Sequence, residues 1–370
     1  MRGAIRRQDV LKLVSVGGIA ALSAHALHEY VPWVDYDGQA ATSRKGSSPN
    51  APAPLKMQGL VRYATLAANG HNAQPWKFET LADAIEIHPD CSRRLVAADP
   101  SDRELWISLG CALENLVVAA RAMGYEPAIT YPDANDVIRV SLSPATPRWS
   151  ATFDAIPRRQ STRSEYDGKA VAAGQLHQLR TMPLEEGIAI HTVVDRNGVS
   201  TLAGYIYEAT LRQYSNPPFL AELIRWLRFD KKEALASFDG LFSPCAGSPA
   251  VPRWLGRLFV SGAKPENLAA ADVRKLESSA GAIVITSAAE GKSDWVRAGQ
   301  VCQRLTLTMT LANIKSAYLN QPIEVPPLRS QLRSSLGLDA AYPQLLVRFG
   351  YANAMPRPLR RPVEQVLMPS

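Results

Sequence analysis

Three side chains that suit an anion occupy alternate positions of one short segment: Arg159, Ser161 and Arg163. In an extended segment all three point to one face, because successive side chains of a strand alternate between two faces. Two guanidinium groups and a hydroxyl on one face suit a phosphate group or the electron-rich edge of a cofactor ring. Because Arg158 adds a third arginine, a solvated basic turn is the alternative.

A second run, Asn72 to Trp76, carries a different kind of chemistry. Pro75 restricts the backbone, Trp76 fills apolar space, and Asn72 and Gln74 offer amide groups either to a bound ring or to the backbone of their own loop. Near the end of the chain, Arg357, Arg360 and Arg361 precede Pro362. This basic segment is interpreted either as a further phosphate contact or as a charged tail.

Composition indicates a folded protein of one large or two modest cores, with 370 residues, 46% hydrophobic and 20% charged. The formal net charge is +7, of which the first 26 residues carry +3. The remaining basic residues form no long run, so binding to nucleic acid is not expected. Six scattered histidines and four cysteines without C-x-x-C spacing predict no metal site, and Cys111 and Cys302 are expected in the core.

Residues 1–26 read as an export leader. Arg6 and Arg7 begin a twin-arginine-type pattern, a weakly apolar run over 14–22 follows, and Ala24-His25-Ala26 matches a small-residue cleavage site. The run is too short to span a bilayer, which takes roughly twenty helical residues. An amphipathic N-terminal helix is the alternative. The leader predicts the export machinery as a partner and a periplasmic or other extracytoplasmic location, with cleavage or retention of the leader left open.

The rest of the chain is predicted to hold two α+β halves. Residues 27–57 are expected to be a linker, because 38–54 are rich in Gly, Ser, Ala and Pro. The first half, 58–150, is predicted to contain a long amphipathic helix over 101–123, capped by Ser101 or Asp102, and strands at 76–79, 85–88, 128–131 and 137–142. The proline-rich stretch 144–157 is the expected hinge.

The second half, 151–370, is predicted to repeat this plan. A strand over 283–286 precedes a helix over 294–310, and other helices are expected near 172–180 and 198–213. Trp106 and Gly110 match Trp295 and Gly299 at the same spacing, so these two long helices are expected to pack together as in a dimer core. Residues 216–262 are expected to be an irregular, partly helical insertion that either packs on its own domain or forms a lid over a cofactor.

These motifs, taken in order, resemble those of the nitroreductase family, and most closely its Acg-like branch. The resemblance rests on Gly70-His71-Asn72-x-Gln74-Pro75-Trp76, Asp99-Pro100-x-x-Arg103-Glu104-Leu105, Arg159-x-Ser161-x-Arg163, Trp295-x-x-Ala298-Gly299-Gln300, Asn320-Gln321-Pro322-Ile323-Glu324-Val325-Pro326 and Pro343-Gln344-Leu345-Leu346-x-Arg348-x-Gly350-Tyr351.

The resemblance implies a nitroreductase-like α+β fold in which two tandem halves of one chain mimic a homodimer, so that no obligate homodimer is required. It implies one FMN site, with NAD(P)H as electron donor. The residues implied in cofactor binding are Asn72, Gln74, Pro75, Trp76, Arg159, Gln160, Ser161, Arg163, Gln321, Pro322, Glu324, Arg360 and Arg361. No catalytic side chain is implied, because the flavin carries the chemistry; the backbone of Glu324 is implied near flavin N5.

The function implied is hydride transfer from NAD(P)H through the flavin to a nitroaromatic, quinone or similar small acceptor. The alternative is a protein that binds and sequesters FMN under a lid without turnover. A third interpretation, loss of the flavin altogether, stays open because Ala67-Ala68-Asn69 stands where the family has Ala-Pro-Ser.

Overall fold

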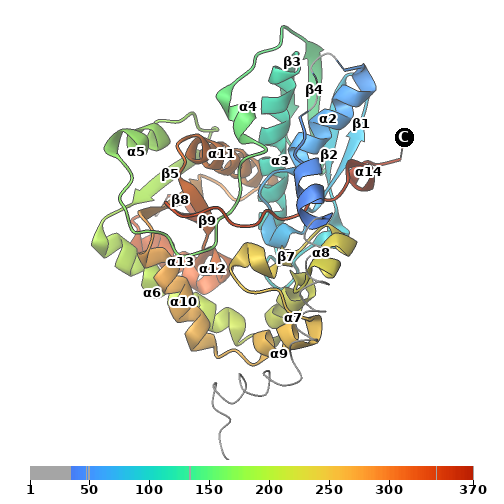
Figure 1. Ribbon diagram of the computed structural model, residues 1–370. Helices are drawn as coiled ribbons and strands as arrows, with labels where there is room; N and C mark the ends of the chain where they lie inside the picture. The colour runs from blue at the N-terminus through green and yellow to red at the C-terminus, as the bar shows by residue number, and fades with distance from the viewer. Residues whose placement is uncertain (1–34, 47, 49–50, 133–134, 339, 370) are drawn as a thin grey trace, which may run out of the picture.

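The computed structural model describes residues 35–46, 48, 51–132, 135–338 and 340–369. The predicted leader, 1–26, lies outside these residues. Two antiparallel four-stranded sheets dominate the described chain, one built from residues 76–144 and the other from residues 188–350 (Figure 1). The predicted α+β class is confirmed.

The first sheet has the strand order β1-β2-β4-β3. Its strands are β1 (Trp76–Thr80), β2 (Ala84–Pro89), β3 (Tyr125–Thr130) and β4 (Ile138–Pro144). These are the four strands expected from the sequence: β1 and β2 are one or two residues longer than predicted, β3 begins three residues earlier and ends one earlier, and β4 begins one residue later and ends two later. The hinge predicted over 144–157 contains a short helix, α4 (Ala151–Ala155).

The second sheet has the order β5-β8-β10-β9. Its strands are β5 (Ile188–Val193), β8 (Gly281–Ser287), β9 (Lys315–Tyr318) and β10 (Tyr342–Gly350). Every residue of β8 is buried. Ile283 and Ile285 belong to the large central core, whereas Val284 belongs to a separate cluster with Leu202 and Leu276. The alternation of side chains therefore gives this strand apolar contacts on both faces.

Helices cover both sheets. The first half contains α2 (Ala53–Thr65) and α3 (Arg103–Ala122), with the short α14 (Val363–Val366) against α2. The second half contains α5 (Ala173–Arg180), α6 (Arg196–Tyr214), α10 (Pro265–Glu277), α11 (Lys292–Leu311), α12 (Gln321–Glu324) and α13 (Pro326–Ser335). By length and hydropathy α3 is suited to cross a membrane, but nine-tenths of its most apolar stretch is buried inside the fold.

The two longest helices, α3 and α11, lie against each other at the centre of the molecule (Figure 1). Gly110 and Gly299 mark the contact. A Cβ atom at Gly110 would lie 2.0 Å from the Val296 carbonyl oxygen, and one at Gly299 would lie 2.1 Å from the Ile107 carbonyl oxygen. Glycine is therefore required on both helices, and the expectation that they pack together is confirmed.

The N-terminal cap of α3 differs from the prediction. Asp102 precedes the helix, but it has a left-handed φ of +58° and its side chain forms no capping hydrogen bond. Its carboxylate instead accepts from Arg94 Nε at 2.6 Å. Asp99 supplies the cap, because its Oδ2 accepts from the Leu105 amide at 2.9 Å. Spacing alone did not distinguish these aspartates.

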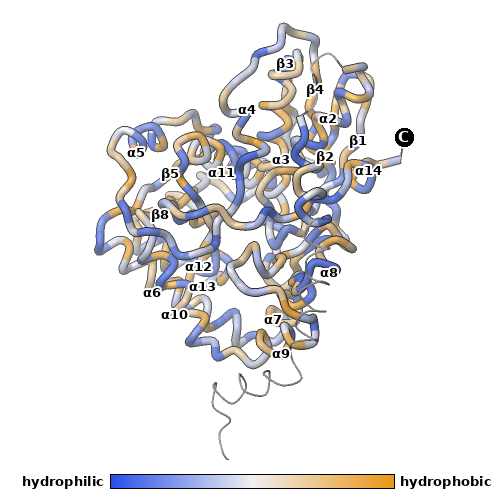
Figure 2. The backbone as a smooth tube through the Cα atoms, in the orientation of Figure 1, coloured by the Kyte–Doolittle hydropathy of each residue, from blue (hydrophilic) through white to orange (hydrophobic). Residues whose placement is uncertain are grey.

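The insertion, 216–262, contains α7 (Pro217–Trp226), α8 (Lys231–Ser237) and α9 (Arg253–Ser261). Two short parallel strands, β6 (Leu227–Arg228) and β7 (Leu241–Phe242), connect them. It is partly helical, as expected. Figure 2 shows hydrophobic stretches along α7 and α9, at the lower end of the view in Figure 1.

The structure corrects the prediction that residues 27–57 form a linker. Residues 35–42 are helical and α2 already begins at Ala53. Tyr36 is fully buried beside Phe242 and Leu359, and its hydroxyl donates to the Arg357 carbonyl at 2.7 Å. A composition rich in Gly, Ser and Ala concealed one anchoring aromatic side chain.

The end of the chain returns to the first sheet. Leu367 forms a parallel bridge with Phe78 of β1, and the Met368 amide donates to the Phe78 carbonyl at 2.8 Å. Residues 351–369 therefore leave the second half, to which the sequence had assigned them, and cross to the first.

Replacing Gly110 by alanine is expected to lower the free energy of unfolding by about 3 kcal/mol or more, because the added methyl group overlaps backbone atoms of α11 that cannot rotate away. Urea denaturation measures this. Gly204→Ala is the matched control, since nothing lies within 4 Å of a Cβ at that position of α6, and it is expected to stabilise by roughly 0.5–1 kcal/mol. Equal denaturation midpoints for Gly110→Ala and wild type would contradict the close crossing.

Candidate functional site

A cavity of about 270 Å³ is lined by residues of both halves. Gly70, His71, Ile107 and Cys111 come from the first half, and Arg163, Cys302, Tyr318, Asn320, Gln321 and Glu324 come from the second. Its size lies near the lower end of pockets that hold drug-sized ligands, roughly 300 Å³ and upward.

Three of the predicted site residues line this cavity: Arg163, Gln321 and Glu324. Gln321 Nε2 donates to Asp272 Oδ2 at 2.9 Å. Pro322 is buried behind the turn that presents them. The Arg163 segment and the turn after β9 are thus brought to one cavity, together with the start of the Asn69–Asn72 loop.

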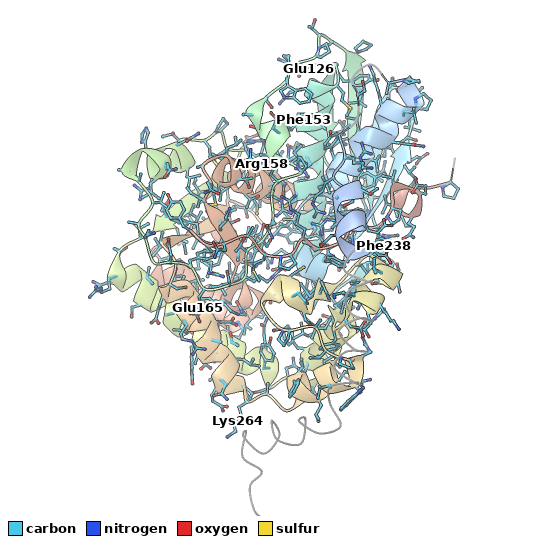
Figure 3. All side chains as sticks on the ribbon, in the orientation of Figure 1. Glu126, Phe153, Arg158, Glu165, Phe238 and Lys264 are labelled. Carbon is cyan, nitrogen blue, oxygen red and sulfur yellow. The ribbon has the colours of Figure 1, made fainter. Side chains whose placement is uncertain are left out.

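Asn72 and Gln74 hold loops together at this edge of the cavity. Asn72 Nδ2 donates to the Gly240 and Leu359 carbonyls at 3.1 and 3.2 Å. Gln74 Nε2 donates to the carbonyl of Phe238, labelled in Figure 3, at 2.8 Å. Both amides therefore bind loop backbone, one of the two uses the sequence left open.

The backbone of this run explains its residue types. His71, Asn72 and Gln74 all adopt left-handed conformations, with φ of 48°, 53° and 55°. Asn is among the residues that tolerate this region best. The turn buries Trp76 completely at the start of β1, and the Pro75 carbonyl accepts from the Asp90 amide at 3.0 Å. Trp76 and Pro75 shape the loop from within the core.

Arg159 and Arg360 form the most unusual electrostatic feature. Arg159 is 5% exposed and Arg360 is 6% exposed. Arg159 Nη2 donates to the Leu66 carbonyl and Arg360 Nη2 to the Ala67 carbonyl, each at 3.1 Å. Arg159 Nε and Nη1 and Arg360 Nε are buried without a hydrogen-bond partner in the described chain. These two guanidinium groups therefore retain unused donors.

The positive charge around them is reinforced rather than neutralised. Burial, followed by the neighbouring Arg159 charge, holds the pKa of Arg360 well below its usual value. Burial lowers the pKa of Arg44 to about 10, with Arg357 and Arg159 adding to the effect. Among the described residues no ion pair joins a carboxylate to Arg44, Arg159 or Arg360. Buried charges are ordinarily paired, so the cluster lacks an anion.

The remaining predicted residues take supporting positions. Gln160 Nε2 donates to the Met355 carbonyl at 2.9 Å, and Ser161 forms a parallel β-bridge with Ser316 of β9. The Arg361 amide donates to Gln74 Oε1 at 2.8 Å, and its Nη1 lies 3.6 Å from an oxygen of Asp90. Unlike Arg360, Arg361 has a carboxylate beside it.

Two glutamate side chains, Glu104 and Glu324, also line the cavity. Gln213 Nε2 donates to Glu324 Oε2 at 2.6 Å, and Asn320 Nδ2 donates to Glu104 Oε1 at 3.1 Å. Burial, followed by the charge of Glu104, raises the pKa of Glu324 well above its usual value. The raised pKa favours the protonated, neutral form of Glu324.

Sequence reasoning missed several residues of this site. Arg44 was assigned to a linker, and the side chains of Glu104 and Gln213 had no role. Phe219 and Leu223 of the insertion also line the cavity. Their spacing of four on one helix was the available signal.

Outside the cavity, Glu79, Glu86 and His88 lie together on the first sheet, with Glu86 already paired to Arg139 at 2.6 Å.

No family model matches the chain. Two Mycobacterium tuberculosis proteins are similar to it over most of their length. One (strain H37Rv), named provisionally as an NAD(P)H nitroreductase, is 25% identical over 90% of this chain and 95% of its own. The other (strain H37Rv), uncharacterised, is 26% identical over 84% of this chain and 92% of its own. This similarity supports the nitroreductase family.

Solved nitroreductases also align with part of the chain. An FMN-bound nitroreductase from Desulfitobacterium hafniense is 14% identical, with a TM-score of 0.38, over 60% of this chain and all of its own. An FMN-dependent nitroreductase from Mycobacterium smegmatis in complex with NADPH is 13% identical, with a TM-score of 0.35, over 60% of this chain and 93% of its own.

His71 is expected to make the protein less stable in acid. Burial, then the Arg163 charge, lowers the pKa of His71 to about 4, and its Nδ1 has no described partner. Between about pH 6.5 and 4 the unfolded chain binds more protons than the folded one, so stability falls as pH falls. By pH 4.5 the expected loss is at most about 2.5 kcal/mol.

Urea unfolding of wild type and His71→Asn at pH 7 and 4.5 measures this contribution. Asparagine accepts the left-handed backbone but does not titrate. The variant should therefore lose less stability than wild type between the two pH values, even though other carboxyl groups titrate in both proteins. Identical losses would show that His71 is protonated freely in the folded state.

Proposed function

We propose that the chain binds one FMN between its halves and is an NAD(P)H-dependent flavin oxidoreductase of nitroreductase type. The observation that carries this proposal is the buried, uncompensated arginine pair Arg159 and Arg360 beside a cavity of about 270 Å³. A phosphate group has the charge and the acceptor oxygens that these unused donors require. The similar M. tuberculosis protein named for NAD(P)H nitroreduction supports the same assignment.

The residues present fit this cofactor. Arg159 and Arg360, with Arg44 close by, would hold the phosphate, and Arg163 is placed to meet the ring, because it lines the cavity itself. Ile107, Phe219 and Leu223 supply apolar surface. FMN, when bound, supplies the hydride transfer between NAD(P)H and an acceptor such as a nitroaromatic or a quinone.

A side chain of the protein is placed to supply a proton to the acceptor. Reduction of a quinone or nitro group consumes protons as well as electrons, and the raised pKa of Glu324, in the cavity wall, favours the protonated acid that can supply one. Burial raises the pKa of Glu324, and the charge of Glu104, which accepts from Asn320 and pairs with Arg103, adds to the rise. We therefore assign Glu324 as the proton donor, a role for its side chain beyond the backbone role implied by the sequence.

Sequestration of FMN without turnover is the second candidate, and one observation favours it. The insertion closes one side of the cavity with Phe219, Leu223 and Leu241 and is bound to the Asn72 loop through Gly240. Reduction of the bound flavin by NADPH in the absence of oxygen separates the candidates: loss of the yellow colour supports the oxidoreductase, and a persistent yellow colour supports sequestration.

Export remains part of the proposal. Residues 1–26 carry the twin-arginine-type pattern, and that pathway moves folded proteins, which suits a chain that takes up its cofactor before transport. As part of this proposal, we expect the chain to belong to the Acg-like branch and its two halves to have arisen by duplication.

Arg159→Met is expected to weaken FMN binding by about 1.5–3 kcal/mol, through loss of charge-assisted hydrogen bonds to the phosphate. Fluorescence titration of the flavin-free protein measures this. Arg158→Met is the matched control, because Arg158 is adjacent but exposed (Figure 3). Riboflavin, which lacks the phosphate, should bind wild type and Arg159→Met equally. If both ligands weaken equally, Arg159 does not contact the phosphate.

Glu324→Gln removes the proton but keeps the size and the hydrogen bond with Gln213. We expect FMN affinity and flavin reduction by NADPH to be preserved, while quinone turnover falls by roughly 10²-fold, the lower range for loss of a general acid. Stopped-flow absorbance separates the two half-reactions. Glu165→Gln, at an exposed carboxylate (Figure 3), should change neither. A slowed first half-reaction in Glu324→Gln would count against the proton-donor role.

A further inference from the structure

Two thiols from opposite halves meet in the cavity wall. Cys111 on α3 is 2% exposed and Cys302 on α11 is 1% exposed, and both line the cavity. Neither has a role in the proposed flavin chemistry. Their burial alone is ordinary for cysteine, so the argument depends on how the two sulfur atoms are held.

The glycine crossing brings these cysteines together. A Cβ at Gly299 would lie 2.9 Å from the Cys111 amide nitrogen, so the backbones of α3 and α11 are in direct contact at this level. Cys111 Sγ donates to the Gly299 carbonyl at 3.2 Å. Each of the two thiols shifts the pKa of the other, so they are neighbours across this crossing. A disulfide needs Cα atoms about 4.4–6.8 Å apart, a separation that only a close helix crossing allows.

The surroundings make the two thiols unequal. Tyr318, whose hydroxyl lies 3.4 Å from Cys302 Sγ, also lines the cavity. The neighbouring Cys111 thiol lowers the pKa of Cys302, and the Tyr318 hydroxyl and the Arg159 charge act in the same direction. The neighbouring Cys302 thiol, followed by burial, raises the pKa of Cys111 well above its usual value. Because the Cys111 thiol donates its proton to the Gly299 carbonyl, and the Tyr318 hydroxyl lies beside Cys302 Sγ, Cys302 is the sulfur placed to react as a thiolate.

We propose that Cys302 and Cys111 are a peroxide-reactive pair that closes reversibly into a disulfide between α3 and α11. The Cys302 thiolate attacks one oxygen of hydrogen peroxide, the O–O bond breaks, and a sulfenic acid and hydroxide form. The Cys111 thiol then attacks the sulfenic sulfur, which releases water and forms the disulfide. In total two thiols lose two electrons and peroxide gains them, giving two waters; an added dithiol reverses the reaction.

This arrangement separates the pair from the other cysteines. Cys91 is exposed, and Cys245 is buried with its sulfur 3.6 Å from the Tyr36 hydroxyl. Neither has a second thiol beside it among the described residues. Both serve as internal controls within the same chain, because they report general oxidation and general unfolding respectively.

The test is peroxide oxidation of the full chain, free of flavin, followed by alkylation under denaturing conditions and peptide mass spectrometry. The expected result is a cross-linked peptide pair containing Cys111 and Cys302, two hydrogens lighter than the reduced peptides, that disappears after treatment with dithiothreitol. Because flavin is absent, this outcome is independent of the proposed function. Free Cys111 and Cys302 after Cys91 has been fully oxidised would overturn the proposal.

Variants assign the two roles. Cys111→Ser should leave Cys302 as a sulfenic acid that is trapped by dimedone, whereas Cys302→Ser should leave Cys111 unoxidised. Tyr318→Phe should slow disulfide formation roughly threefold, because the rate follows the thiolate fraction of the attacking sulfur. Circular dichroism of each variant checks the fold. Sulfenic acid at Cys111 in Cys302→Ser, at the rate seen for wild type, would overturn the assignment of Cys302 as the attacking thiol.

Discussion

The contact between Gly110 and Gly299 determines what else the molecule can do. Helices ordinarily pack 8–10 Å apart because side chains separate them, but here two glycines let backbone meet backbone. Each helix carries residues of the cavity wall on the turns beside the crossing: Ile107 and Cys111 on α3, and Cys302 on α11. A wider crossing would separate these walls, so the width of the cavity follows from two missing side chains.

Buried groups of both charge signs lie at the cavity. Arg159 and Arg360 bring positive charge to the backbone at Leu66 and Ala67, whereas Glu104 and Glu324 bring carboxyl groups to the cavity wall. Each side is costly alone, since burial disfavours the charged form of any group. For the carboxyl groups, the raised pKa of Glu324 favours its neutral form, which reduces the free-energy cost of burial. Arginine cannot release its proton near neutral pH, so the basic side keeps its charge and requires an anion from outside.

Much of the fold could be predicted from the sequence because its long elements are strongly periodic. The helices α3 and α11 and the strand β8 follow from apolar spacing, and the matching glycines indicated which helices would meet. The helix at residues 35–42 could not be predicted in this way. Its stability depends on Tyr36 contacting Phe242 and Leu359, residues more than 200 positions away, and no local pattern records such a contact.

The candidate site shows the same division between local and distant information. Residue type indicated Arg163, and the family resemblance implied Gln321 and Glu324; all three line the cavity. They did not show that Asn72 would bind Gly240 of the insertion and Leu359 of the C-terminal segment, or that its Oδ1 would accept from Arg360. Partner choice depends on which loops the fold brings together, and here three distant segments meet at one amide.

The hydrogen bonds of Asn72 also explain the role of a residue that does not itself line the cavity. The Asn72 side chain connects the first half, the insertion and the C-terminal segment that carries Arg360. A change in any one of these segments would shift the others through the shared hydrogen bonds. Because the arginines repel one another, they stay in place only while that network holds their backbone. The amide run therefore serves the cavity indirectly, by keeping mutually repelling cations where an anion can join them.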